Sequence, residues 1–174
     1  MNKSEIISSL TAHHTSFINY INGLSDDEYT VSPNQKWTAG QHVQHIILCV
    51  KPLVQVFSMD KFAIEQTFGV AHKPSRIFDD MCNAYSEKLK EGIKAPDRFV
   101  PAAVSPDQRK LQGETLTKVV QALCEKIEGF TEPELDRMCI PHPVLGKLTM
   151  REMLYNAVDH VRHHHKMVQS FVLK

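Results

Sequence analysis

The sequence predicts an all-α protein, a bundle of four or five main helices within a single domain spanning residues 1–174. Apolar residues recur at helical spacing in several long stretches, and capping residues or glycines flank these stretches. Alternating runs of β-branched residues, which are typical of strands, are absent, so no sheet is needed. A chain of 174 residues is also long enough to bury a core without cross-links.

Each predicted helix has a recognisable start or end. Capping boxes, in which a Ser or Thr is followed three residues later by Glu or Gln, mark starts at Ser25, Thr38 and Thr149. Gly23 and Gly129 are natural stops at the ends of helices. In chain order, helices are expected over residues 3–22, 38–57, 76–91 (a shorter one), 107–128 and 149–172, with short extra helical turns at 25–28 and 131–134.

Prolines and glycines mark the connections between these helices. Residues 66–75 are expected to form a loop, in which Ser75 caps the next helix. Residues 93–106 contain three prolines and little periodicity, which predicts a long irregular connection, and such connections are often functional. Pro52 is expected to kink the second long helix or to end its first half. Residues 141–143 are expected to be extended.

Composition excludes several classes of function. Lys and Arg together number 20, as do Asp and Glu, and this balance argues against binding to nucleic acid or to a membrane surface. No apolar run reaches the roughly 18 residues of a membrane span, and the first residues lack the form of a signal peptide. The four cysteines show no C-x-x-C spacing, so we interpret them as buried, reduced and inert thiols. We therefore expect a cytoplasmic protein.

Three histidines on two predicted helices are the most informative residues. His160 and His164 lie one helical turn apart among apolar residues, and His45 lies two turns into the second long helix. If the helices meet, three imidazoles would form a site for a divalent metal with one position left open. Alternatively they are hydrogen-bonded core residues, which is the more typical role of an isolated H-x-x-x-H pair. Val161 stands where H-E-x-x-H has its glutamate, which excludes a zincin.

Neighbouring residues receive other interpretations from their positions. His42, near the start of its helix, is interpreted as a polar surface residue, and His163 and His165 should point away from the apolar stripe. His14 is expected in the core or on the wall of a pocket. Trp37 precedes a helix cap, so we interpret it as a hydrophobic staple in preference to a side chain that stacks on substrate.

Two segments carry a pattern shared with a known protein family. The run Trp37–Ile46 reads W-T-x₆-H-I at the entry to a helix, and Gly146–Thr149 reads G-x-L-T before the helix with the H-x-x-H-H motif of 160–164. In this order and separation the motifs resemble the DinB-like superfamily, also called YfiT-like, and the similarity covers nearly the whole chain. The resemblance implies a four-helix bundle whose metal ligands are His45, His160 and His164. It further implies zinc or nickel as the metal and is consistent with a homodimer.

The resemblance also implies a metal-dependent enzyme acting on a small molecule that the sequence does not identify. Hydrolysis by metal-bound water is the first expectation, and transfer of a low-molecular-weight thiol, or non-catalytic binding of a metal or ligand, are the alternatives. His42, His163 and His142 are candidates for moving protons or contacting substrate. Asp159 is a candidate for orienting a ligand. Substrate selectivity is expected to reside in residues 60–110, which match no motif.

Overall fold

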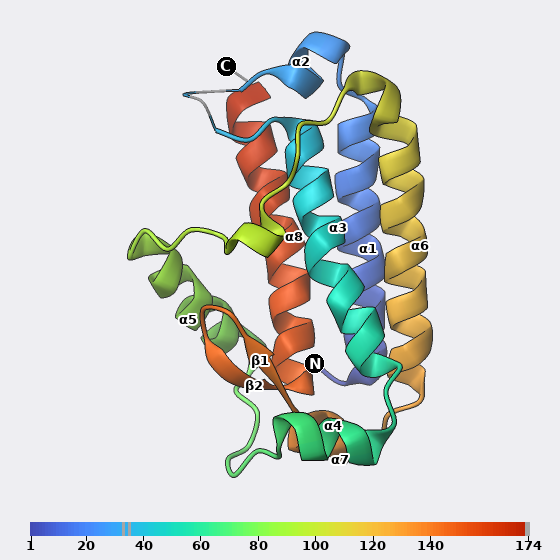
Figure 1. Ribbon diagram of the computed structural model, residues 1–174, viewed down its shortest axis with the longest axis vertical. Coiled ribbons are helices and arrows are strands. Elements are labelled where there is room, and N and C mark those ends of the chain that lie inside the picture. The colour runs from blue at the N-terminus through green and yellow to red at the C-terminus, as the bar shows by residue number, and fades with distance from the viewer. Residues whose placement is uncertain (33, 35, 173–174) are drawn as a thin grey trace.

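The computed structural model describes residues 1–32, 34 and 36–172, and four long helices form its centre (Figure 1). Helix α1 packs against α6 and α8, and α3 packs against the same two helices, so the four close into a bundle. This confirms the all-α prediction and leaves the expected helix at 76–91 outside the bundle. The four helices are α1 (Lys3–Asn22), α3 (Ala39–Phe57), α6 (Arg109–Glu128) and α8 (Met150–Val172).

The predicted capping boxes form at the two helices that matter most for the site. At the start of α3, Thr38 N donates to Gln41 Oε1 at 3.0 Å and Gln41 N donates to Thr38 Oγ1 at 3.2 Å. Thr149 and Glu152 exchange the same pair of bonds, each 3.1 Å long, where α8 begins. Pro52 lies inside α3, which continues unbroken to its end, so the proline does not terminate the helix. Burial of apolar side chains on both sides of it outweighs the one lost backbone bond.

A small β-hairpin corrects the prediction that the chain needs no sheet. Strand β1 (Cys139–His142) pairs antiparallel with β2 (Gly146–Thr149), immediately before α8. The strands are four residues long, too short for alternation to be recognised in the sequence. The extended conformation expected around residue 142 is confirmed, and Gly146 takes the positive φ of 72° that the turn requires.

The chain between α3 and α6 leaves the bundle and returns along α8. Helix α4 (Lys61–Phe68) is not predicted from the sequence, although Asp60 caps it by accepting hydrogen bonds from two backbone N–H groups. Helix α5 (Phe78–Lys90) begins later than expected, because Ile77 and not Ser75 occupies its N-cap. Figure 1 shows α5 beside the lower half of α8, outside the bundle, and the two helices are in contact.

The remaining connections follow the sequence prediction. The two short turns are α2 (Asp26–Thr30) and α7 (Glu132–Arg137), each opened by a capping box. Between α5 and α6 the connection is irregular apart from two 3₁₀ turns, η2 (Asp97–Phe99) and η3 (Pro106–Gln108). Turn η2 packs against α3, which brings the middle of this long connection onto the bundle.

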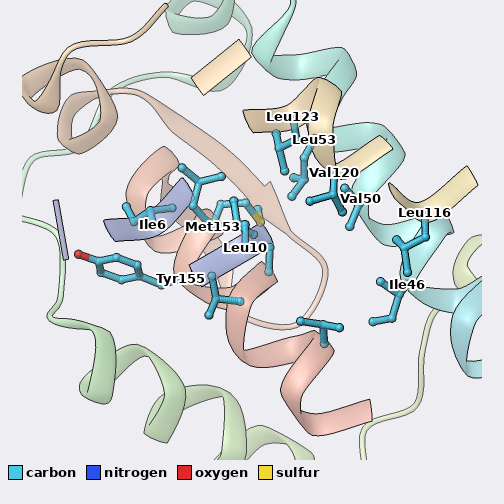
Figure 2. Packing of buried hydrophobic residues seen from close by; sticks show 14 of the residues in the cluster. Ile6, Leu10, Ile46, Val50, Leu53, Leu116, Val120, Leu123, Met153 and Tyr155 are labelled. Carbon is cyan, nitrogen blue, oxygen red and sulfur yellow. The ribbon is translucent and has the colours of Figure 1, made fainter. Parts of the chain in front are cut away.

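The hydrophobic core lies between the four long helices, and Figure 2 shows part of it. Leu10 of α1, Ile46 of α3 and Leu116 of α6 are each at most 1% exposed, and Leu154 of α8 is fully buried. Each such side chain contributes about 2 kcal/mol through removal of its apolar surface from water. None of the described helices is long and apolar enough to cross a membrane.

Candidate metal centre

The three predicted ligands meet between α3 and α8. His45 Nε2 lies 3.2 Å from His160 Nε2, which in turn lies 2.9 Å from His164 Nε2. All three side chains are at most 9% exposed. One nitrogen from each ring lies within 4.8 Å of the others, so the three could hold a single metal ion.

The spacing of these nitrogens suits a small divalent ion. With a Zn–N distance of 2.0–2.1 Å, two imidazole nitrogens on a tetrahedral ion stand about 3.3 Å apart. The observed separations of 2.9 and 3.2 Å are close to that value. Facing lone pairs at this distance repel unless a proton or a cation lies between them. The residues therefore fit a metal, and an all-imidazole donor set suits both zinc and nickel.

Hydrogen bonds on the opposite ring nitrogens orient two of the three imidazoles. His45 Nδ1–H donates to the backbone carbonyl of Phe99 in η2 at 2.7 Å, which leaves the lone pair on Nε2 directed at the cluster. His164 Nδ1 lies 2.7 Å from His42 Nδ1. We assign the shared proton to His164, because its Nε2 then keeps the lone pair that a metal needs.

Burial keeps these imidazoles neutral. It is the largest cause that lowers the pKa of His160 and His164 well below the ordinary 6.5, and neighbouring histidines add to it. Burial likewise lowers the pKa of His42 to about 4. The pKa of His45 is also lowered by burial, against the opposing effect of the Phe99 carbonyl. Neutral imidazole is the form that binds metals, so the cluster is ready to bind an ion at pH 7.

Two residues interpreted as peripheral lie at the centre of the site. His42 is 2% exposed, so its interpretation as a surface residue is wrong; the rings of Trp37 and Phe171 lie beside it. The centroid of the Trp37 ring is 4.7 Å from that of His45 and 6.3 Å from that of His164. Trp37 therefore forms a wall of the site, a role that the staple interpretation does not include.

Cys49 places a thiol beside the cluster. Its Sγ atom lies 3.6 Å from His45 Nε2, one turn further along α3. Burial raises the pKa of this thiol to about 12, so it is protonated at neutral pH. The interpretation of the cysteines as inert core residues misses this contact. The i, i+4 spacing of His45 and Cys49 was the available signal.

A cavity of roughly 1160 Å³ opens onto the three histidines. Its walls come from α3, α5, the hairpin, α8 and the irregular connection before α6. The Tyr85 ring packs perpendicular to that of His160, with the ring centroids 6.0 Å apart. The segment 60–110, which carries no motif, therefore supplies much of the wall, at Phe68, Tyr85, Leu89 and residues 93–100.

His142 is held by both of its ring nitrogens. Its Nδ1 accepts hydrogen bonds from the backbone N–H groups of Val144 and Leu145, both 3.1 Å long. The ring proton therefore lies on Nε2, which donates to Asn156 Oδ1 at 3.2 Å. These bonds fasten the hairpin to α8. His142 lines the cavity, but neither nitrogen is free to take part in proton transfer.

The other sequence candidates lie in different environments around His45, His160 and His164, which together form the triad. His163 is half-buried, lines the cavity and packs its ring against His164 with the centroids 5.3 Å apart. His165 packs instead against aromatic rings of α1. His14 is 1% exposed and donates to a carbonyl of its own helix, which confirms a core position. Asp159 lies 3.8 Å from Arg162 and forms no hydrogen bond to the triad among the described residues.

Comparison with known proteins agrees with this arrangement. A family model described as the DinB superfamily matches residues 9–168, a range that contains all three histidines of the cluster. Comparisons with curated proteins and with solved structures give no match. The family match covers most of the sequence, and the helical fold and the histidine cluster are consistent with it. The chain belongs to the DinB superfamily.

Proposed function

We propose that this protein is a metal-dependent enzyme in which His45, His160 and His164 hold one divalent ion, zinc or nickel. The convergence of three Nε2 atoms at 2.9 and 3.2 Å, beside a large cavity, carries the proposal. Three protein ligands leave a coordination position free, which is the arrangement of catalytic rather than structural zinc sites. The cavity gives a small-molecule substrate access to that position.

The proposed reaction is hydrolysis. A divalent ion held by His45, His160 and His164 would supply Lewis acidity and so make water a better nucleophile near pH 7. The chain's own residues hold and enclose the site: the Phe99 carbonyl and His42 orient two of the ligands, and Trp37 covers them. His163 lies in the cavity wall and is our candidate for accepting a proton from the reacting group.

The charge of the donor set supports a second candidate, the transfer of a low-molecular-weight thiol. Three neutral imidazoles would leave the full positive charge on an ion held there, and that charge would favour binding of a thiolate. The two candidates share the same metal ligands and cavity. They differ in the nucleophile, which is water in one and an external thiol in the other.

Metal content tests the ligand set directly. Protein purified without a histidine tag should contain, or take up, about one equivalent of Zn²⁺ or Ni²⁺ per chain. His160→Ala should lose most of that metal, because it removes the central imidazole, whereas His165→Ala should keep it. Elemental analysis that finds no uptake by the wild type, or equal losses in the two variants, would refute the assignment.

Turnover assays then separate the proposed reactions. Zinc- and nickel-loaded protein should hydrolyse at least one member of a panel of esters and amides, and chelation should abolish the activity. Activity seen only when a thiol and an electrophilic acceptor are both present would favour thiol transfer. A loaded protein that gains thermal stability from the metal and turns over neither panel would be a binding protein.

A further inference from the structure

A side-chain amide whose nitrogen is unpaired belongs to the cavity wall, one helical turn from the triad. Asn156 precedes His160 by four residues and His164 by eight, so it shares their face of α8. The side chain is 7% exposed, and its Nδ2 atom has no hydrogen-bond partner within the described part of the chain. Buried donors are nearly always paired, so an unpaired one in a residue that lines a cavity calls for an acceptor there, which a water or the oxygen of a ligand can supply.

The bonds of His142 fix which atom of this amide is unpaired. Because His142 Nδ1 accepts two backbone N–H groups, the ring proton must lie on Nε2. The atom of Asn156 that faces this proton at 3.2 Å is therefore the oxygen. A flipped amide would place two donors against each other. The group left for a ligand is thus a hydrogen-bond donor, and it suits an oxygen acceptor.

The charged side chains around the cavity favour an anion. Lys36, Lys51, Lys94 and Arg98 line it, against a single carboxylate, Asp97. This is a strong local bias in a chain whose charges balance at 20 against 20. All four cations are exposed, and the ion pairs within the described residues are formed by other side chains. Cations around the opening of a cavity concentrate anions there and speed their entry.

We propose that the cavity binds a small molecule with an apolar body and an oxyanion, a carboxylate or a phosphate, whose oxygen accepts a hydrogen bond from Asn156 Nδ2. The apolar body packs against side chains of the wall such as Met153 and Val144. The exposed cations attract the oxyanion. The inference rests on the proposed function only where it calls this ligand the substrate; recognition itself needs the amide and the cavity.

Ligand binding to metal-free protein tests the inference without the metal. Trp37 is the only tryptophan and lines the cavity, so its fluorescence reports occupancy. The probes are phenylacetate, phenyl phosphate and the neutral phenylacetamide, titrated at constant ionic strength into chelator-treated protein. At least one anion should bind about tenfold more tightly than the amide, because hydrogen bonds to charged groups are the stronger ones. The better anion identifies the oxyanion, and equal affinities for all three would overturn the proposal.

Two sets of variants locate the recognition. Asn156→Asp keeps the oxygen that binds His142 but replaces the donor by an anionic acceptor, so affinity for the preferred anion should fall by about tenfold or more while phenylacetamide is little affected. The double variant Lys51→Gln/Lys94→Gln leaves the buried wall unchanged and should weaken anion binding, whereas Lys118→Gln on the exposed face of α6 should not. The proposal would be overturned if Asn156→Asp and the Lys51→Gln/Lys94→Gln variant both bound the anion as tightly as the wild type does.

Zinc uptake by the wild type separates failure of this inference from failure of the proposed function. Anion binding by a protein that takes up no zinc or nickel would support the oxyanion site and refute the metal-dependent enzyme. Metal uptake by a protein that binds the anions no more tightly than phenylacetamide would refute the oxyanion site and support the metal centre.

Discussion

His42 should control how tightly the triad binds metal, although it is not one of the predicted ligands. His42→Ala removes the ring whose Nδ1 lies 2.7 Å from His164 Nδ1. His164 then loses the acceptor that fixes its tautomer, and its buried N–H is left unpaired. Removing such a partner typically lowers metal affinity by about 10–100-fold, which corresponds to about 1.4–2.7 kcal/mol.

Competition with a chromophoric chelator measures this change. Zinc is titrated into tag-free protein and chelator, and the dissociation constants of wild type, His42→Ala and His165→Ala are compared. The last is the control, because its ring packs against Phe17 and Tyr20 and not against the triad. A His42→Ala affinity within about twofold of both wild type and control would refute the orienting role.

Three further predictions concern stability. Gly40→Ala would bring a Cβ within 2.7 Å of the Tyr29 ring and should lower the free energy of unfolding in urea by about 1–3 kcal/mol. Gly23→Ala should change this free energy little, because the nearest neighbour of its Cβ would lie at 3.5 Å. Burial lowers the pKa of His14 to about 4. The unfolded chain therefore binds a proton at this residue below about pH 6.5, and the folded chain binds it only near pH 4. As the pH falls through that window, the free energy of unfolding should decrease by roughly 3 kcal/mol because of this residue. In His14→Met this decrease should be smaller. Chelating the metal from loaded protein should lower Tm, because an ion that binds only the folded state stabilises it.

The results that contradict these predictions are equally specific. Equal unfolding curves for the two glycine variants would mean that Tyr29 can move aside at no cost. An unchanged pH dependence in His14→Met would show that this imidazole does not titrate as its burial implies. A Tm that is the same before and after chelation would mean that the metal binds the unfolded chain as tightly as the folded one, or that the protein binds no metal.

The long helices could be predicted because their signals are local. Apolar spacing and capping boxes such as Thr38 with Gln41 depend on residues within one or two turns, and the structure forms them where expected. The hairpin and α4 were missed for the opposite reason. Each is short, and each is stabilised by contacts with distant parts of the chain, such as the backbone bonds between residues 69–71 and 137–139 that join the end of α4 to β1.

The triad was predictable in part, because two of its members lie one turn apart on a single helix. The groups that contact the triad from outside, such as the Phe99 carbonyl and His42, were not predictable. The acceptor for His45 is a backbone carbonyl, that of Phe99, and every residue has one, so no residue type marks it. The inward position of His42 depends on Trp37, which precedes the helix, and on Phe171, which lies near the end of α8. Sequence spacing within one helix cannot reveal such packing.

The triad and much of the cavity wall come from different segments of the chain, and this separation bears on substrate specificity. All three imidazoles of the triad come from α3 and α8, whose packing in the bundle fixes their separation. Much of the cavity wall comes from α5 and the connection that follows it, and these segments contact the triad at Tyr85 and at the Phe99 carbonyl. Substitutions at Leu89 or in residues 93–98 should therefore change which small molecule fits without moving the three histidines. Substitutions that move the Phe99 carbonyl should alter both the fit of the small molecule and the orientation of His45, because that carbonyl accepts the hydrogen bond from His45 Nδ1.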